Sequence, residues 1–176
     1  KYVYSRVFDT IVKHVNLSLS KGDRAKQESD RMIGILDIFG FEVFQNNSFE
    51  QLCINYCNER LQTFFNDIIF KEELAIYEEE GVDCSGIQYQ DNLECVRVID
   101  AAKNTGIFSF LDEECVVPQG SDEKLLKKMD NAFSSKTDPA YSKYYQLNRK
   151  LPNTFIVGHF AGDVVYNITG FMEKNK

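Results

Sequence analysis

The stretch ILDIFGFEVFQNNSFEQLCINYCNERLQTFF, residues 35–65, joins two different patterns at a glycine. Its first part belongs to the apolar run MIGILDIF, residues 32–39. A near-continuous run of this kind predicts a short strand buried on both faces. Its second part predicts an amphipathic helix, roughly 40 Å long, that begins after Ser48. Asp37 and Glu42 bracket Gly40 at the joint. A loop that only connects two elements needs no acids there, so we expect this loop to contact a ligand.

The long helix carries its own start and stop signals. Ser48 with Gln51 three residues later predicts a capping box, and Gly81 is a typical stop signal. Residues at helical spacing predict one apolar stripe: Phe49, Leu52, Cys53, Tyr56, Leu61, Phe64, Phe65, Ile68 and Ile69.

The other elements read as further helices and one hairpin. Helical spacing predicts a first helix up to about Leu19, followed by an exposed loop, and a third helix that begins at Asp91. GIFSFLDEECVVPQGSDEKLLKKM predicts a helix, a turn at Pro118 and Gly120, and a second helix. The segment SKTDPAYSKYYQLNRKLPN is expected to be irregular, and TFIVGHFAGDVVYNI predicts a β-hairpin. The fold class is therefore mainly α with a short buried strand and a β-hairpin.

Composition excludes several classes of protein. No apolar run approaches the roughly 20 residues that cross a bilayer. The net charge of −7 disfavours binding to nucleic acid or to an anionic membrane. Five cysteines that frame no loops indicate a reducing, intracellular setting. Cys53 and Cys57 have a spacing that can bind metal, but no histidine lies near them in the sequence, so core packing is favoured. His14 and His159 are isolated in the sequence.

Asp37 and Gly40 form a D-x-x-G pattern with a specific chemistry. An acid at the end of a buried strand can hold Mg²⁺ through its water shell. A glycine shortly afterwards lets a backbone amide approach a phosphate oxygen. The four-residue pattern alone is also compatible with an ordinary turn.

Longer strings decide between these readings. LDIFGFE followed by NSFEQLCINYCNERLQ closely resembles the switch II loop and relay helix of the myosin motor domain. GIFSFLDEEC resembles the actin-binding helix-loop-helix of that family, and HFAGDVVYNITGFMEKNK resembles its lower-subdomain hairpin and following helix. A fourth string, YSRVFDTIVKHVN, resembles the helix before switch II. The four strings occur in the order that the family has. The chain is therefore identified as a partial motor domain, and the dipeptide Ile38-Phe39 indicates an unconventional class. Cys84 stands where most members carry a tryptophan, so we expect the relay loop to pack differently against the converter.

The resemblance implies a division of the chain. The expected parts are 1–30, a helix and loop; 31–42, the strand and switch II; 43–90, the relay helix and loop; 91–135, the actin-binding helix-loop-helix; and 136–176, an irregular segment, hairpin and helix. They would belong to the lower subdomain of a P-loop NTPase-type α/β motor, in the cytoplasm and on the cytoskeleton.

The resemblance also implies roles for individual residues. Asp37 would lie in the second shell of Mg²⁺, Gly40 would donate its amide to the γ-phosphate of ATP, and Glu42 would pair with an arginine of switch I. Filamentous actin would be the partner of the helix-loop-helix. Its expected contacts are Thr105, Phe110, Val116, Val117, Pro118, Lys124, Lys127 and Lys128.

The sequence lacks other parts of such a motor. It contains no G-x-x-x-x-G-K-[ST] phosphate loop and no switch I, and the converter is absent. We therefore expect this chain alone to hydrolyse no ATP at a useful rate, and to depend on the remainder of the motor domain. An isolated actin-binding module without catalysis is the alternative. A kinesin or small G protein is disfavoured by the long capped helix directly after the acid-glycine loop.

Overall fold

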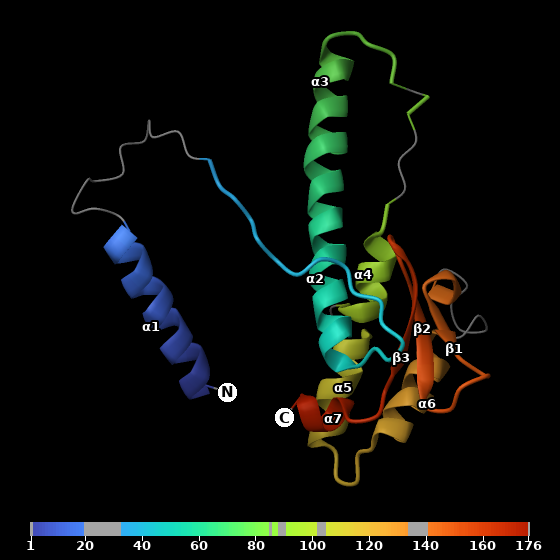
Figure 1. Ribbon diagram of the computed structural model, residues 1–176. Coiled ribbons are helices and arrows are strands. Elements are labelled where there is room, and N and C mark those ends of the chain that lie inside the picture. Colours follow the sequence, from blue (N-terminus) through green and yellow to red (C-terminus); the bar gives the residue numbers. More distant parts are fainter. Residues whose placement is uncertain are drawn as a thin grey trace. The chain divides into compact units, whose positions relative to one another are not determined.

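The computed structural model describes residues 2–19, 33–84, 86–87, 91–101, 105–133 and 141–175. The chain divides into two units, residues 1–37 and residues 38–176, and each is described by itself (Figure 1). Within the described residues, no helix is both long and apolar enough to cross a membrane.

The first unit contains helix α1, Tyr2–Leu19, as the spacing predicts. The helix makes side-chain bonds one turn apart, from Thr10 to the Arg6 carbonyl and from Arg6 to the Tyr2 hydroxyl. None of its residues is buried. The apolar residues at helical spacing that indicated this helix are all at least 40% exposed: Val3, Val7, Phe8, Ile11, Val12 and Val15. The loop expected after it falls mostly outside the described residues.

The strand expected over MIGILDIF, residues 32–39, is not formed at residues 33–39, the part of this run that the structure describes. Residues 33–44 have no regular secondary structure, and Ile33 and Ile35 are 95% and 93% exposed. For the described residues 33–39, the prediction of a buried strand is therefore wrong. A strand must satisfy its backbone groups by pairing with a neighbour, and within the described residues no strand pairs with this run.

The second unit is built on one continuous helix of three parts (Figure 1): α2, Phe49–Asn66; η1, Asp67–Glu72; and α3, Glu73–Glu79. At its start the Ser48 amide donates to Gln51 Oε1 at 3.0 Å, which is one half of the predicted capping box. At its end Gly81 has a φ of 75°, a conformation that glycine adopts readily. The middle part, η1, is π-helical, which the sequence did not indicate.

Shorter helices and a small sheet complete this unit. The helices are α4, Leu93–Ile99; α5, Ile107–Val116; α6, Asp122–Phe133; the 3₁₀ turn η2, Tyr141–Lys143; and α7, Phe171–Lys174. The strands are β1, Tyr145–Leu147; β2, Thr154–His159; and β3, Gly162–Asn167. They form an antiparallel sheet in the order β1-β2-β3. The predicted hairpin is β2–β3, whereas β1 lies in a segment expected to be irregular.

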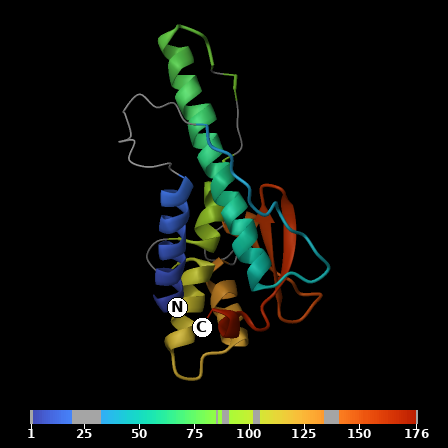
Figure 2. The same ribbon diagram turned by 60° about the vertical axis from the view of Figure 1, so that its left-hand side comes forward.

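The core lies between the sheet and the helices α2, α4, α5 and α6 (Figure 2). A row of aromatic rings runs across the sheet from α6: Phe133, Tyr145, Phe155 and Tyr166, with neighbouring ring centroids 5.2, 5.9 and 5.6 Å apart. Buried aromatic rings at these separations contribute packing energy beyond their area. The prediction of a mainly helical fold with a hairpin is confirmed. The shared core holds α2 against β3.

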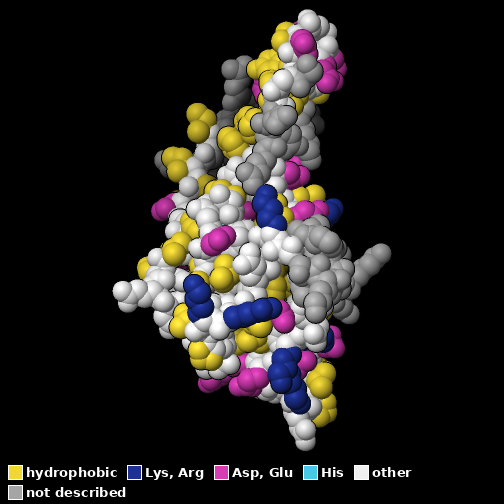
Figure 3. Space-filling view, turned by 90° about the vertical axis from the view of Figure 1, so that its right-hand side faces the viewer, with side chains coloured by type: hydrophobic (Ala, Val, Ile, Leu, Met, Phe, Trp, Pro, Cys, Tyr) yellow, Lys and Arg dark blue, Asp and Glu magenta, His cyan; other side chains and the backbone are white. Residues whose placement is uncertain are grey.

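Only the first half of the long helix is fixed in this way. Phe64 and Phe65 are 62% and 52% exposed, and Ile69 and Ile76 are 43% and 47% exposed. Hydrophobic side chains stand out on this protruding upper part of the helix (Figure 3). Of the predicted apolar stripe from Phe49 to Ile69, only Leu52 is buried; its members up to Leu61 are otherwise half-buried, and those from Phe64 on are exposed. Periodicity marks an apolar face without showing what lies against it.

Candidate functional site

Asp37 and Gly40, expected to contact a ligand, are both exposed. Gly40 is not required by the fold. Its φ lies outside the left-handed region that favours glycine. A Cβ placed on it would meet no described atom within 4 Å. A glycine that neither backbone conformation nor crowding demands is the kind of residue that close approach to a ligand can explain.

Glu42 is attached to α2 through Asn55. The Glu42 amide donates to Asn55 Oδ1 at 2.8 Å, and Asn55 Nδ2 donates to the Glu42 carbonyl at 2.8 Å. The carboxylate of Glu42 also accepts a bond from Gln51 Nε2 at 3.3 Å. One turn further along α2, Asn58 Nδ2 donates to the carbonyl of Phe39 at 3.0 Å. The loop thus contacts three positions of α2 that lie on successive turns.

Phe41 anchors the same loop on the hairpin side. Its ring lies edge-on to His159, with centroids 5.2 Å apart, and edge-on to Phe160 at 5.9 Å. Phe39, in contrast, is 72% exposed. Phe41 is thus half-buried against the core, and it fixes the loop to the hairpin.

A buried polar network continues from Asn55 into the hairpin. Asn55 Nδ2 also donates to the Tyr166 hydroxyl at 2.8 Å, and that hydroxyl lies 2.9 Å from His159 Nε2. Burial raises the pKa of Tyr166, so its hydroxyl stays protonated and can donate to the histidine. His159 Nδ1 in turn lies 2.8 Å from Glu59 Oε2, and both side chains are fully buried. His159, which is isolated in the sequence, therefore has partners on both ring nitrogens in the fold.

Glu59 receives further donors from α4 and the hairpin turn. Asn92 Nδ2 donates to Glu59 Oε1 at 2.6 Å, and the Phe160 amide approaches both carboxylate oxygens at 3.3 and 3.4 Å. Thr63 Oγ1 donates to Asn92 Oδ1 at 3.0 Å. Burying a carboxylate without partners costs free energy, and the hydrogen bonds that these donors make to Glu59 offset that cost.

The sequence contained a signal for this network. The buried residues of α2 recur every three or four positions and are mostly polar: Leu52, Asn55, Glu59, Thr63 and Asn66. Asn, Glu and Thr at this spacing are usually taken as the solvent face of a helix. Here they form the buried face, because the hairpin and α4 supply their partners.

Glu59, Cys95 and His159 also form a candidate metal site, because one donor atom from each lies within 4.8 Å of the others. Zinc–ligand bonds of about 2.0–2.3 Å place tetrahedral ligand atoms roughly 3.3 Å or more apart. His159 Nδ1 and Glu59 Oε2 are 2.8 Å apart, which is hydrogen-bonding distance. Burial raises the pKa of the Cys95 thiol and opposes the thiolate that a metal needs. The three residues therefore act as a hydrogen-bonded group.

The predicted helix-loop-helix is formed by α5 and α6, joined by a short turn at residues 117–121. Val116 and Val117 at this turn are 85% and 45% exposed, and Pro118 is also exposed. Ser121 caps α6, since its Oγ accepts the Lys124 amide at 3.2 Å. The turn therefore presents apolar side chains on a well-formed hairpin.

The other expected contacts on this hairpin differ in position. Phe110 is 7% exposed and belongs to the core. Thr105 is exposed but precedes α5, at the opposite end from the turn. Lys128 pairs with Glu113 at 2.6 Å, and Lys124 Nζ donates to the Gln119 carbonyl at 2.6 Å. The exposed apolar side chains at the turn are thus the two valines and the proline, and Lys124 is bonded to the exposed Gln119 beside them.

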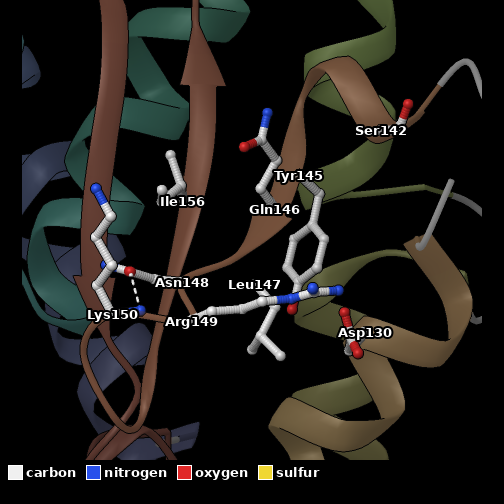
Figure 4. Close-up of a pocket in the computed structure, with 9 residues that line it drawn as sticks. All are labelled: Asp130, Ser142, Tyr145, Gln146, Leu147, Asn148, Arg149, Lys150 and Ile156. Carbon is white, nitrogen blue, oxygen red and sulfur yellow. Dashed lines mark hydrogen bonds between the residues drawn. The ribbon is translucent and has the colours of Figure 1, made fainter.

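A pocket of 640 Å³ lies along β1, at the far edge of the sheet from Glu42 (Figure 4). Its lining includes Asp130 of α6 and the basic residues Arg149 and Lys150, and the Arg149 side chain extends toward Asp130 (Figure 4). The buried Tyr145 hydroxyl has no hydrogen-bond partner among the described residues. On this side of the molecule basic side chains lie among apolar and acidic ones (Figure 3). None of the residues that line the pocket belongs to the Glu42 loop or to the polar network around Glu59.

Comparison with known proteins agrees with the arrangement of loop, helix and hairpin. The family model described as "Myosin head (motor domain)" matches residues 1–176. The chain is 44% identical over 176 residues to "Myosin IA heavy chain" of Dictyostelium discoideum, covering 100% of this chain and 17% of that protein. It is 44% identical to "Myosin-52" of Schizosaccharomyces pombe, covering 100% of this chain and 11% of that protein. It is 42% identical to "Myosin-2" of Arabidopsis thaliana, covering 100% of this chain and 13% of that protein. The chain thus spans less than a fifth of the length of these relatives, and it belongs to the myosin head (motor domain) family.

Proposed function

We propose that this chain is the part of an actin-based motor that senses the nucleotide and passes its state to a lever. In this proposal residues 37–42 are the switch II loop, α2 with η1 and α3 is the relay helix, and the α5–α6 hairpin binds filamentous actin. The observation that carries the proposal is the pair of 2.8 Å bonds between Asn55 and the backbone of Glu42. They join the loop to the long helix without an intervening residue.

The nucleotide end of the proposal concerns three residues. The carboxylate of Asp37 suits Mg²⁺ held through water, and the exposed Gly40 suits a backbone amide that donates to the γ-phosphate. Glu42 would pair with a switch I arginine. In the intact motor Mg²⁺ and ATP would supply the charge and the phosphoryl group that the loop senses. The catalytic phosphate loop would come from the remainder of the motor domain.

The relay end of the proposal concerns the exposed half of the long helix. At about 1.5 Å per residue the three helical parts extend roughly 45 Å, so a small rotation at Glu42 becomes a larger displacement at the far end. The π-helical residues Asp67–Glu72 interrupt the regular hydrogen bonding, and such segments often occur at functional sites. The exposed apolar side chains beyond them suit a partner surface such as the converter.

Actin binding is proposed for the turn of the hairpin. Val116, Val117 and Pro118 are exposed there, and Lys124 and Lys127 add positive charge beside them. Phe110 is left out of the contact surface because it is buried, and Thr105 because it lies at the other end of α5. Lys128 is proposed only as a secondary contact, because it already pairs with Glu113. Such a role would place the protein on the cytoskeleton, in the cytoplasm.

An isolated actin-binding module remains the second candidate function. The hairpin is fixed in the core of the second unit, where its residues Leu111, Leu125, Met129 and Phe133 are at most 2% exposed. A surface held this firmly can bind a partner without any catalysis by the same chain.

The test is co-sedimentation of the chain with filamentous actin at low and raised salt. We expect binding that resists salt, because apolar contacts are not screened, and we expect Val117→Asp to abolish it. Val82→Asp is the matched control, since Val82 is 51% exposed in a loop far along the chain from the hairpin. Binding that Val117→Asp leaves intact would contradict the proposed surface.

A further inference from the structure

Residues 170–175, which include α7, lie between the α5–α6 hairpin and the start of α2. On the hairpin side, Asp122 accepts two backbone bonds from this segment. Asp122 Oδ2 accepts the Gly170 amide at 2.7 Å, and Oδ1 accepts the Met172 amide at 3.1 Å. Asp122 is the first residue of α6 and directly follows the turn proposed to bind actin. The segment is therefore fixed to the hairpin next to that turn.

The same segment is also fixed to α5. Asn175 Nδ2 donates to Asp112 Oδ1 at 2.8 Å, and Cys115 Sγ donates to the Met172 carbonyl at 3.7 Å. Both helices of the hairpin thus hold residues 170–175. A movement of the hairpin must either carry the segment along or break these bonds.

The opposite side of the segment contacts the first turn of α2. Lys174 Nζ donates to Ser48 Oγ at 2.9 Å and to Glu50 Oε2 at 2.7 Å. The hydrogen bond from Lys174 holds the pKa of Glu50 below its usual range. Phe171 is fully buried, and its ring lies edge-on to Phe49 with centroids 5.5 Å apart. An exposed ion pair alone contributes little, but the buried Phe171 and the half-buried Phe49 fix the same junction by their packing.

From this turn the bonds continue to the carboxylate of Glu42. The Ser48 amide donates to Gln51 Oε1 at 3.0 Å, and Gln51 Nε2 donates to Glu42 Oε2 at 3.3 Å. An unbroken series of contacts therefore runs from the start of α6 to Glu42. It does not pass through Asn55 or through the buried network around Glu59.

We infer that residues 170–175 form a brace through which the α5–α6 hairpin influences Glu42, with Asp122 and Lys174 as positioning residues at its two ends. This inference rests on the proposed function, in which the hairpin binds actin and Glu42 belongs to the nucleotide sensor. Under it, actin held at residues 116–118 acts on Asp122, the brace transmits the constraint to the first turn of α2, and Gln51 then holds the Glu42 carboxylate more firmly.

The test measures hydrogen exchange of the chain without actin, at the Glu42 amide and at the amides of the first turn of α2. Asp122→Ala removes the bonds at one end of the brace, and Lys174→Met removes those at the other. We expect each variant to raise exchange at these amides about fivefold, which corresponds to losing one net hydrogen bond. We expect the double variant to do no more than either single one, because both act on one connection.

Two exposed neighbours supply matched controls. Glu123→Ala alters the start of α6 beside Asp122, and Glu173→Ala alters α7 beside Lys174; we expect neither to change exchange at Glu42. We expect Lys174→Arg to keep the exchange rate of the unaltered chain, since arginine can still donate to Glu50. The inference is overturned if Asp122→Ala leaves Glu42 and α2 unchanged, if the two effects simply add, or if Lys174→Arg exchanges as fast as Lys174→Met.

A second readout separates the brace from the proposed function. In a motor domain that contains this chain in full, brace variants should lower the maximal actin-activated ATPase rate severalfold and leave the half-saturating actin concentration unchanged. An unchanged maximal rate would overturn the inference. Failure of the unaltered chain to co-sediment with actin would count against the proposed actin surface, whereas the actin-free exchange result would still decide whether the hairpin and Glu42 are coupled.

Discussion

Asn55 binds Glu42 at both backbone groups, accepting from its amide and donating to its carbonyl, each at 2.8 Å. Within the described residues no strand pairs with the backbone of Glu42. The fully buried side chain of Asn55 on α2 makes the two backbone bonds that a neighbouring strand would make. The same amide nitrogen also reaches the Tyr166 hydroxyl of the hairpin. Asn55 therefore connects three segments that are far apart in the sequence: the loop, the long helix and β3.

Replacement of Asn55 by alanine should destabilise the second unit. The change leaves the Glu42 backbone groups without this partner, and each buried polar group that loses its partner costs about 1–3 kcal/mol. We expect the free energy of unfolding in urea to fall by about 2–4 kcal/mol. Asn46→Ala, in the exposed loop, should change it by less than about 0.5 kcal/mol. Equal effects of the two substitutions would argue against the linking role of Asn55.

The buried pair of Glu59 and His159 predicts a larger loss. Removing one partner of a buried pair typically costs about 3–5 kcal/mol, because the other is left uncompensated. We therefore expect Glu59→Ala to lower the free energy of unfolding by that amount, measured by denaturant titration. The control is Glu94→Ala, which removes a surface pair with Arg97 on α4 and should cost about 0.5 kcal/mol or less. A small effect at Glu59 would mean that the network contributes little.

The cysteines should differ in reactivity in a way that tests burial on α2. Burial, with a smaller contribution from Glu50, raises the pKa of Cys53 to about 11, whereas Cys57 is exposed. At pH 8 this pKa lowers the thiolate fraction of Cys53 roughly 100-fold below that of an ordinary cysteine. The more basic thiolate is also about tenfold more nucleophilic, so Cys53 should react with iodoacetamide roughly tenfold more slowly. Cys57 should be labelled first and Cys95 only on unfolding, as followed by peptide mass spectrometry. Labelling of Cys53 as fast as Cys57 in the folded chain would contradict this packing.

Local signals in the sequence predicted local structure well. Helical spacing and capping residues indicated α1, the start of α2 and the α5–α6 hairpin, and alternation indicated β2 and β3. These features depend on neighbours within a few positions. The motif Asp37-x-x-Gly40 and the strings around it also indicated the family, which the match over residues 1–176 confirms.

Features that depend on distant partners were missed or wrong. The strand expected over MIGILDIF, residues 32–39, has no pairing strand among the described residues, and apolar composition alone cannot supply one. Phe64 and Phe65 are exposed although they continue an apolar stripe. Glu59 and Asn92 lie 33 positions apart, so their bond could not be inferred from spacing. The roles of Asp37, Gly40 and Glu42 remain predictions that rest on chemistry.

Substitution of Gly40 by alanine can separate folding from the proposed nucleotide sensing. A Cβ at this position meets open space, and the backbone needs no left-handed conformation. Gly→Ala at a compatible position commonly stabilises a protein by about 0.4–1 kcal/mol. We therefore expect the unfolding free energy of the chain to stay the same or rise slightly. In a motor domain that contains the chain, the added methyl group should obstruct approach to the phosphate and lower ATP turnover at least about 100-fold.

Gly34→Ala provides the matched control for this prediction. A methyl group placed on Gly34 would also meet no described atom within 4 Å, and Gly34 lies six positions before Gly40 in the same run. Since it stands outside the D-x-x-G pattern, its substitution should leave ATP turnover within about twofold of the unaltered motor, because exposed sites away from special features tolerate change. If the two variants turned over ATP at the same rate, Gly40 would be an ordinary loop residue. A loss confined to Gly40→Ala, with unfolding unchanged, would instead assign the glycine to contact with the nucleotide.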